Sequence, residues 1–235
     1  PQVVVLVATV RALKYHGGVP KDDLNFENLA ALERGMENLQ RHLTNIKEHY
    51  GLPAIVSINH FTHDTDAEVE LLRSKVELIG GIAVVAKHWA NGGAGAEELA
   101  RTVVDAIEQQ PCTHRYVYED TDSLWSKINA IATKIYGASG ISASTRVRAE
   151  IEKLNEQYGN FPVCIAKTQM SFSTDPLLLG APSGHNVEIS DVRLSAGARF
   201  IVAIAGNMMT MPGLPKVPAA ENIDVDKSGN IVGLF

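Results

Sequence analysis

Short apolar runs alternate with amphipathic helical patterns along the first half of the chain. Continuous apolar runs occupy residues 3–8, 54–58 and 82–86, and each is followed by polar residues and then by a helical pattern. Strands that alternate with helices are typical of a parallel sheet. We therefore predict an α/β fold, with a mostly parallel sheet flanked by helices. The run at 3–8 resembles a strand buried on both faces, so we expect it in the middle of that sheet.

The helical patterns have recognisable ends. Residues 28–50 carry an apolar stripe at spacings of three and four, formed by Leu29, Leu32, Met36, Leu39, Leu43 and Ile46. A capping-box pattern at Thr65 and Glu68 predicts a second helix that runs to about Ile79. Further helices are expected at 96–109, 122–136 and 144–157, and further strands at 115–118, 161–166 and 200–205. Residues 10–18 end in two glycines and are interpreted as a loop.

Turn signals dominate the chain from Thr174 onward. They include Asp175-Pro176, residues 180–184 and residues 212–215. A terminal hairpin is predicted, with strands at 223–225 and 230–232 around the turn at 227–229. We expect two portions: residues 1–140, an α/β portion with a ligand pocket, and residues 141–235, a smaller C-terminal α+β portion that ends in this hairpin.

Composition excludes some functions. The 235 residues carry a net charge of −6 and a pI near 5.8, which argues against a general nucleic-acid or anionic-membrane binder. No apolar run is long enough to cross a bilayer. Cys112 and Cys164 lack metal-binding spacing, so we expect reduced thiols and a cytoplasmic protein. The chain opens directly on a strand and on Pro1, which suggests a C-terminal piece of a longer protein.

Aromatic residues follow two of the predicted strands. Ligands of parallel sheets bind beyond the carboxyl ends of the strands, where Asn59 and Phe61 follow one run and Trp89 follows the next. The two rings suit a flat ligand. Gly92 and Gly93 lie in a glycine-rich loop before a helix, a weak indication of anion binding. Packing of the rings beneath loops is the alternative, and the pattern alone slightly favours it.

Cationic residues also follow strands. Lys14 and His16 come after the first strand, and Lys167 follows the strand at 161–166, so an anionic substrate such as a phosphate or carboxylate fits. The sequence contains no GxSxG, HExxH, CxxC or GxxxxGK[ST] motif. These patterns alone define a soluble α/β protein with a candidate ligand cleft.

Longer motifs carry a resemblance to a known family. In order, the chain reads VVLVATVRALKYHGG from Val4, SINHFTHDTDAE from Ser57, KHWANGGAGAEELA from Lys87, AKTQMSFS from Ala166 and DVRLSAGARF from Asp191, followed by MTMPGLPKVPAAENIDVD. Together they resemble formate–tetrahydrofolate ligase, in its bacterial single-function form, over essentially the whole chain.

The resemblance implies an ATP-dependent ligase of one-carbon metabolism. Such enzymes convert ATP, formate and tetrahydrofolate into ADP, phosphate and 10-formyltetrahydrofolate through formyl phosphate. It also implies Mg²⁺ and a monovalent cation, a cytoplasmic homotetramer, small-molecule substrates, and neither nucleic acid nor membrane as a partner.

The resemblance assigns roles to residues at the strand ends. Phe61 and Trp89 match the two positions whose rings stack on the pterin of the folate, so the pocket of residues 1–140 is expected to be the folate pocket. Asn59 and the backbone of Gly92 and Gly93 are expected to support it. The catalytic residues stay unassigned, with Lys14, His16 and Lys167 as candidates on the phosphate side of the cleft.

Part of the family pattern is missing. The ATP-binding glycine-rich loop and the arginine that binds formyl phosphate belong to the N-terminal half of the family's chain, and neither occurs here. We therefore expect the missing N-terminal half as a partner, and an inactive chain in its absence. A non-catalytic folate-binding or interaction module on the same fold is the alternative, and an unrelated small-molecule enzyme is a third interpretation.

Overall fold

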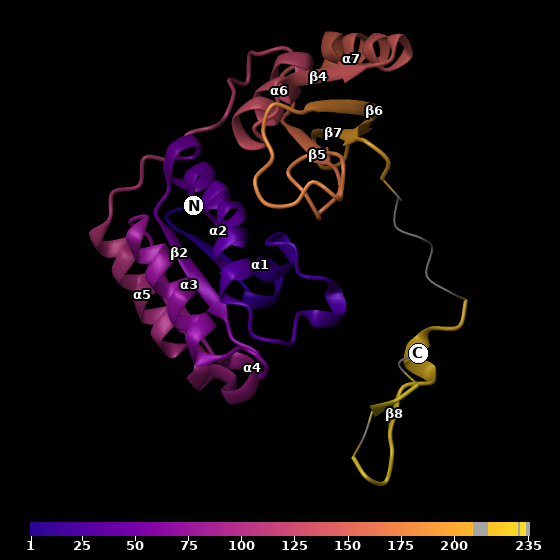
Figure 1. The fold of residues 1–235 in the computed structure, drawn as a ribbon. Coiled ribbons are helices and arrows are strands. Elements are labelled where there is room, and N and C mark those ends of the chain that lie inside the picture. Colours follow the sequence, from indigo (N-terminus) through magenta and orange to yellow (C-terminus); the bar gives the residue numbers. More distant parts are fainter. Residues whose placement is uncertain (209–215, 230, 234–235) are drawn as a thin grey trace.

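Two β-sheets, each with its own helices, make up most of the molecule (Figure 1). The computed structural model describes residues 1–208, 216–229 and 231–233. The first sheet is parallel and the second is mixed, and a small hairpin near the C-terminus follows them. The predicted α/β class, with a parallel sheet flanked by helices, is confirmed.

Three parallel strands form the first sheet in the order β1-β2-β3. They are β1 (Val4–Ala8), β2 (Ala54–Asn59) and β3 (Ile82–Ala86). Every side chain of β2 before Asn59 is buried, as its continuous apolar pattern predicts. In register, Ala8 of β1 lies beside Ile58 of β2, and Asn59 of β2 lies beside Ala86 of β3. The carboxyl ends of the three strands therefore meet at one edge.

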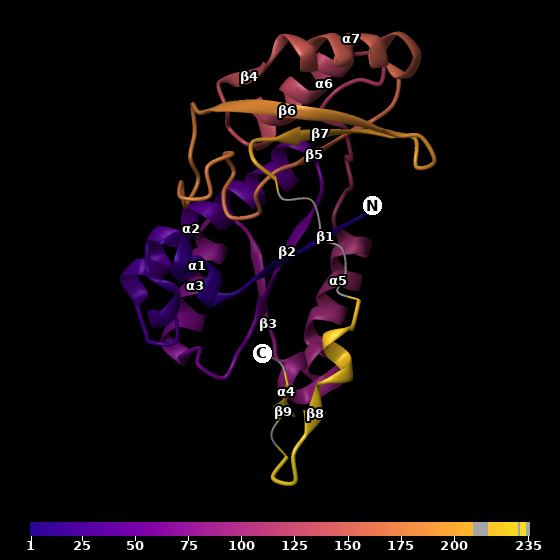
Figure 2. The same cartoon turned by 90° about the vertical axis from the view of Figure 1, so that its right-hand side faces the viewer.

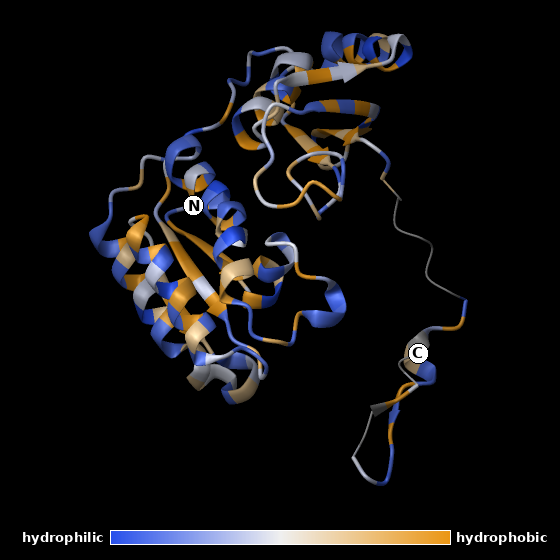
Figure 3. Cartoon of the chain, viewed as in Figure 1, coloured by the Kyte–Doolittle hydropathy of each residue, from blue (hydrophilic) through white to orange (hydrophobic). Residues whose placement is uncertain are grey.

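Helices cover both faces of this sheet, as the view in Figure 2 shows. One face carries α1 (Val10–His16), α2 (Leu29–Thr44) and α3 (Asp66–Leu78), packed on Val56 and Ile58. The other face carries α5 (Glu97–Gln109), packed on Ile55 and Val84. Figure 3 shows largely hydrophobic strands between helices of mixed hydropathy. Amphipathic helices on an apolar sheet place the core on both sides of β2.

The position of β1 differs from the prediction. Among the described residues β1 is an edge strand and β2 is the central one. Val5 lies in register with Ile55, on the face that α5 covers, but α5 contacts β2 and β3. Val5 and Val7 are consequently 37% and 61% exposed. The apolar run therefore predicted the strand correctly but not its central position. No described element covers the part of the sheet face that carries Val5 and Val7.

Residues 10–18 also differ from the prediction, because α1 replaces the expected loop. Thr9 accepts a hydrogen bond from the Ala12 amide and begins the helix, and Gly17 ends it. Lys14 on this helix is only 1% exposed, and its Nζ lies 2.8 Å from Oε1 of Glu68 on α3. Glu68 also accepts hydrogen bonds from the amides of Asn28 and Thr65. The ion pair thus joins α1 to the starts of α2 and α3.

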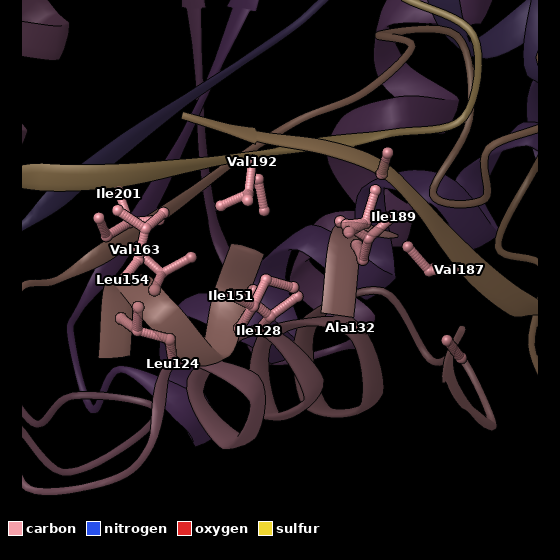
Figure 4. Close-up of a cluster of buried hydrophobic side chains, with 14 residues drawn as sticks. Leu124, Ile128, Ala132, Ile151, Leu154, Val163, Val187, Ile189, Val192 and Ile201 are labelled. Carbon is pink, nitrogen blue, oxygen red and sulfur yellow. The ribbon is translucent and has the colours of Figure 1, made fainter. Parts of the chain in front are cut away.

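The second sheet is mixed, with strand order β4-β6-β7-β5. Its strands are β4 (Gly140–Ala143), β5 (Val163–Ala166), β6 (Asn186–Ser195) and β7 (Phe200–Ala205). Helices α6 (Leu124–Ala130) and α7 (Thr145–Tyr158) pack on it, and Figure 4 shows Ile128, Ile151 and Ile189 in the shared core. Helix α6 precedes residue 140 yet belongs to this core; the division at residues 140 and 141 stays a prediction.

Short regular segments complete the chain. They are the π-helical turns at Asn45–His49 and Ile131–Ile135, the 3-10 turns at Lys21–Asp23, Gly92–Ala96 and Ala219–Glu221, and helix α4 (His88–Asn91). The predicted hairpin is present as β8 (Asp224–Val225) and β9 (Ile231–Val232), which pair antiparallel. The predicted turn at 212–215, Asn230 of the hairpin and the last two residues lie outside the described residues.

Two strands were missed and one was wrongly predicted. Residues 115–118 form no ladder; the Arg115 amide instead donates a hydrogen bond to the carbonyl of Tyr50. Strand β4 is only four residues long, and β6 lies in a stretch whose flanking turn residues were interpreted as loop. The α-helices expected at 28–50 and 122–136 both end earlier, in the π-helical turns. Within the described ranges, no helix combines the length and apolar character needed to cross a membrane.

Candidate functional site

Phe61 and Trp89 follow neighbouring strands of the parallel sheet. Phe61 lies two residues beyond the end of β2, and Trp89 is the second residue of α4, which follows β3. Since Asn59 and Ala86 are in register, the two strands end at the same edge of the sheet, and an aromatic residue follows each of them. Phe61 is half-buried, whereas Trp89 is 69% exposed. This is the edge at which parallel sheets bind ligands.

A pocket of about 430 Å³ lies beside Phe61. Tyr15, Leu24 and Met170 add to its apolar wall, and Arg11 and Lys21 supply positive charge. No carboxylate of the described residues lines it. Its size and its mixture of apolar walls with a few polar groups are typical of small-molecule sites. The pocket therefore suits an anionic ligand with a flat apolar part.

A second pocket, of about 420 Å³, lies at the end of β3. His60, Lys87, Asn91 and Gly95 contribute to its lining. Trp89 belongs to the same short helix as Asn91 but does not line this pocket, and Phe61 lines only the first one. The structure thus brings the two predicted aromatic residues to neighbouring strand ends, while the pockets described here do not hold them together.

The glycine-rich loop after β3 forms α4 and the 3-10 turn. Gly92 has a φ of +58°, a left-handed conformation that favours glycine. Gly93 does not have a positive φ, and a Cβ added there would meet nothing within 4 Å, so neither its backbone nor its surroundings require glycine. At Gly95, which was not singled out from the sequence, a Cβ would lie 2.4 Å from the Lys87 carbonyl oxygen. The close approach at Gly95 folds the loop back onto the end of β3, and a third glycine in the run was the available signal.

Asn59 ends β2 with an unsatisfied side chain. Its Oδ1 is buried and accepts no hydrogen bond from the described residues. Buried acceptors without a partner are uncommon in native proteins and are costly. Asn59 thus carries a buried acceptor without a donor among the described residues, although it lines neither of the two pockets described above.

The three cationic candidates lie in different surroundings. Lys14 is buried in its ion pair with Glu68 and lines neither pocket described above. Burial alone would raise the pKa of Glu68, but hydrogen bonds from Lys14 and the Asn28 and Thr65 amides outweigh it, so this pKa lies below its usual value. His16 lines the pocket beside Phe61, and its Nδ1 accepts a hydrogen bond of 3.2 Å from the Gly180 amide. Burial lowers the pKa of His16.

Lys167 lies in the loop after β5, in a third pocket that also contains His16. Burial lowers its pKa to about 8. The ammonium is solvated by carbonyl oxygens, including that of Thr168 at 2.9 Å. His16 thus connects the pocket beside Phe61 with the surroundings of Lys167, a proximity that their positions in the sequence did not reveal.

Metal-binding side chains do not cluster in the described part of the chain. No group of three or more histidine, cysteine, aspartate or glutamate side chains within these ranges is arranged to hold a metal ion. Mg²⁺ prefers carboxylate and phosphate oxygens in octahedral geometry. The Mg²⁺ that the family resemblance implies therefore does not fit a protein-only site in this part of the chain.

These features define a class of protein: an α/β protein with small-molecule pockets at the carboxyl ends of parallel strands. The model of the formate–tetrahydrofolate ligase family matches residues 1–235, the whole chain. The chain belongs to the formate–tetrahydrofolate ligase family. This membership rules out the interpretation as an unrelated enzyme.

Curated relatives carry the same family name. The formate–tetrahydrofolate ligase of Methylococcus capsulatus is 66% identical over 235 residues, and that of Methylibium petroleiphilum is 56% identical over 239 residues. The Symbiobacterium thermophilum ligase is 55% identical over 236 residues. Each alignment includes 100% of this chain but only 42–43% of the relative. The chain therefore spans less than half the length of these relatives.

Proposed function

We propose that this chain supplies the tetrahydrofolate-binding part of an ATP-dependent formate–tetrahydrofolate ligase. The whole enzyme joins formate to tetrahydrofolate at the expense of ATP, through formyl phosphate, and works in the cytoplasm. The single observation that carries the proposal is the pair of aromatic residues at adjacent, in-register strand ends. A pterin is flat and polar at its edge, so two rings can cover its faces while amides and carbonyls bind its edge.

Individual residues have distinct roles in this proposal. Phe61 stacks on one face of the pterin and Trp89 on the other. The free Oδ1 of Asn59 accepts a hydrogen bond from the ligand, and the turn at Gly92 and Gly93 positions α4. Trp89 is 69% exposed, so its ring is accessible to a ligand that would cover it on binding. His16 and Lys167 remain candidates for the phosphate side, and Lys14 acts through the fold.

ATP and formate binding are assigned to residues outside this chain. The sequence has no phosphate-binding glycine loop, and the chain spans about 42% of its relatives. We propose that it is the C-terminal portion and that the N-terminal portion completes the enzyme, in the homo-oligomer that the family resemblance implies. The uncovered side of β1, where Val7 is 61% exposed, supports a further element beside this strand.

Tryptophan fluorescence tests the folate site directly. The chain has two tryptophans, Trp89 and Trp125, and Trp125 packs against the core of the second sheet. We expect tetrahydrofolate to quench the fluorescence of the chain and of a Trp125→Phe variant with a saturable curve. Trp89→Phe should abolish the quenching, because the reporting indole is at the proposed site. Quenching that persists in Trp89→Phe and disappears in Trp125→Phe would place the ligand elsewhere.

An activity assay tests the proposal that ATP and formate bind to residues outside this chain. We expect the purified chain to form no 10-formyltetrahydrofolate from ATP, formate and tetrahydrofolate, because it lacks the phosphate-binding loop. Product would be measured by acid conversion to the methenyl form and its absorbance. Turnover that requires both ATP and formate would refute the proposed inactivity. A full-length relative from Methylococcus capsulatus serves as the positive control.

A further inference from the structure

A third pocket lies between the two sheet-containing parts of the molecule. It has a volume of about 290 Å³ and is formed by α1, α2, the π-helical turn after α6 and the loop after β5. In Figure 1 the long segment between β5 and β6 extends towards α1 and α2. Hydrogen bonds fix this approach: the Gly180 amide donates to His16, and Asn38 on α2 donates to the Gly180 carbonyl. The pocket is therefore a built feature of the fold.

Three basic side chains contribute to the lining of this pocket. They are His16, His42 and Lys167, and no aspartate or glutamate among the described residues lines it. Arg41 and His185 lie near the pocket without lining it. Burial lowers the pKa of His185, and the positive charges of Lys167 and Arg41 lower it further. None of these five residues forms an ion pair with any described carboxylate. In a chain of net charge −6, this is a local excess of positive charge.

Lys167 has no negatively charged partner among the described residues. Its Nζ donates to the carbonyls of Thr168, Ser171 and Ser173 and lies 4.9 Å from the centroid of the Tyr136 ring. These groups satisfy the hydrogen-bond donors of the ammonium, but they carry no negative charge to compensate it. Half-burial of an unpaired cation is costly, and it lowers the pKa of Lys167 to about 8. A bound anion would reduce that cost through its charge, since the three carbonyls already occupy the N–H donors of Lys167.

The histidines around the pocket also have no carboxylate partner among the described residues. The His42 ring rests on Phe172, with 4.6 Å between ring centroids, while the residue stays open to solvent on its other side. Partial burial of the ring, then the positive charges of His16 and Lys167, lower the pKa of His42. Both ring nitrogens of His185 are buried and make no hydrogen bond of ordinary geometry with the described residues, although the Phe172 backbone interacts with the ring and partly offsets the lowering of its pKa. The nearest acid along α2, Glu37, lies by Gly180 and does not line the pocket.

We propose that the pocket formed by His16, His42 and Lys167 binds a doubly charged oxyanion, of the phosphate or dicarboxylate class. Three lining bases without a carboxylate match two negative charges better than one, and the imidazoles supply charge-assisted donors once protonated. The volume accommodates such an ion together with water. The site adjoins the pocket beside Phe61, with which it shares His16 and Gln169, but neither Phe61 nor Trp89 lines it.

Histidine titration by NMR tests the proposal on this chain. The Cε1–H signals would be followed from pH 5 to 9 in inorganic phosphate, in succinate, and in sodium chloride of matched ionic strength. An anion that binds the protonated state more tightly raises the pKa of His42 and His16, and its affinity rises as the pH falls until the anion itself takes up a proton. We expect an increase of about 0.5 pH unit or more at saturation. The exposed His63 and His114 should not respond.

Variants and competing anions make the test decisive. His42→Gln retains the fold because the side chain lies on the open rim, and it should weaken the response of His16 at least threefold in apparent affinity. His114→Gln is the matched control and should change nothing. A response to phosphate alone or to succinate alone identifies the class of the ion. If neither ion moves His42 beyond its shift in sodium chloride, or if His114 moves equally, the proposal is wrong. Neither outcome depends on folate binding.

Discussion

Replacing Glu68 with glutamine is expected to lower the free energy of unfolding by about 3–5 kcal/mol. Glu68 is fully buried and compensates the charge of Lys14, whose side chain is 1% exposed. Loss of the carboxylate leaves the ammonium buried among neutral acceptors, such as the Phe26 carbonyl at 2.9 Å, with no negative charge to compensate it. The amides of Asn28 and Thr65, at the starts of α2 and α3, also lose an anionic acceptor. Urea denaturation followed by circular dichroism measures the effect.

A neighbouring glutamate provides the matched control. Glu70 is on the same helix and pairs with Arg73, but its side chain is 65% exposed. Surface pairs of this kind contribute little, so Glu70→Gln should change the free energy of unfolding by less than about 0.5 kcal/mol. Comparable losses in the two variants would contradict a special role for Glu68. Because Lys14 was a candidate catalytic residue, this result also separates a structural role from a chemical one.

The same ion pair sets an expected pH dependence. The pKa of Glu68 lies below its ordinary value of 4.5 in the folded protein. A carboxyl with a lowered pKa stabilises the fold fully above its unfolded pKa, and this contribution disappears as the pH falls through the folded pKa. Acid should therefore destabilise the wild-type chain below about pH 4.5. Glu68→Gln should show a smaller loss over that range.

The sequence predicted the first sheet well because its signals are local. Strands β2 and β3 are continuous apolar runs, and the capping box at Thr65 and Glu68 is present as predicted. Strand β6 was not predicted. Its buried residues, such as Val187 and Ile189, alternate with polar residues, and the strand follows a segment rich in turn signals. Helix α1 was hidden by the glycines that end it. In both cases tertiary packing selected the structure over the local signal.

The candidate site was predictable only in part, for the same reason. A strand followed by an aromatic residue is visible in the sequence, so Phe61 and Trp89 were found. The register that places Asn59 beside Ala86 is not visible, nor is the partner of Lys14 on a distant helix. The pocket around Lys167 combines residues of four separate segments. Such a combination depends on how the two sheets pack together, which no local pattern specifies.

Replacing Trp89 with alanine is expected to weaken tetrahydrofolate binding about 5- to 150-fold. Stacking of an aromatic side chain on a heterocyclic base contributes about 1–3 kcal/mol, and a pterin offers a comparable face. Trp89 is 69% exposed and sits on the short helix α4, so its removal should leave the stability of the fold unchanged. Isothermal titration calorimetry gives the dissociation constant without relying on the fluorescence of the residue that is removed.

Phe61→Ala should cause a loss of similar size, because the two rings are proposed to cover opposite faces of one ligand. Phe61 is half-buried beside Tyr15 and Leu24, so its variant also requires a melting curve to separate lost binding from lost packing. Tyr116→Ala is the matched control, since Tyr116 is 76% exposed and lies far along the chain from both strand ends. If Trp89→Ala binds tetrahydrofolate as tightly as Tyr116→Ala, the pterin does not stack on Trp89. A loss in Phe61→Ala alone would then move the ligand into the 430 Å³ pocket beside Phe61.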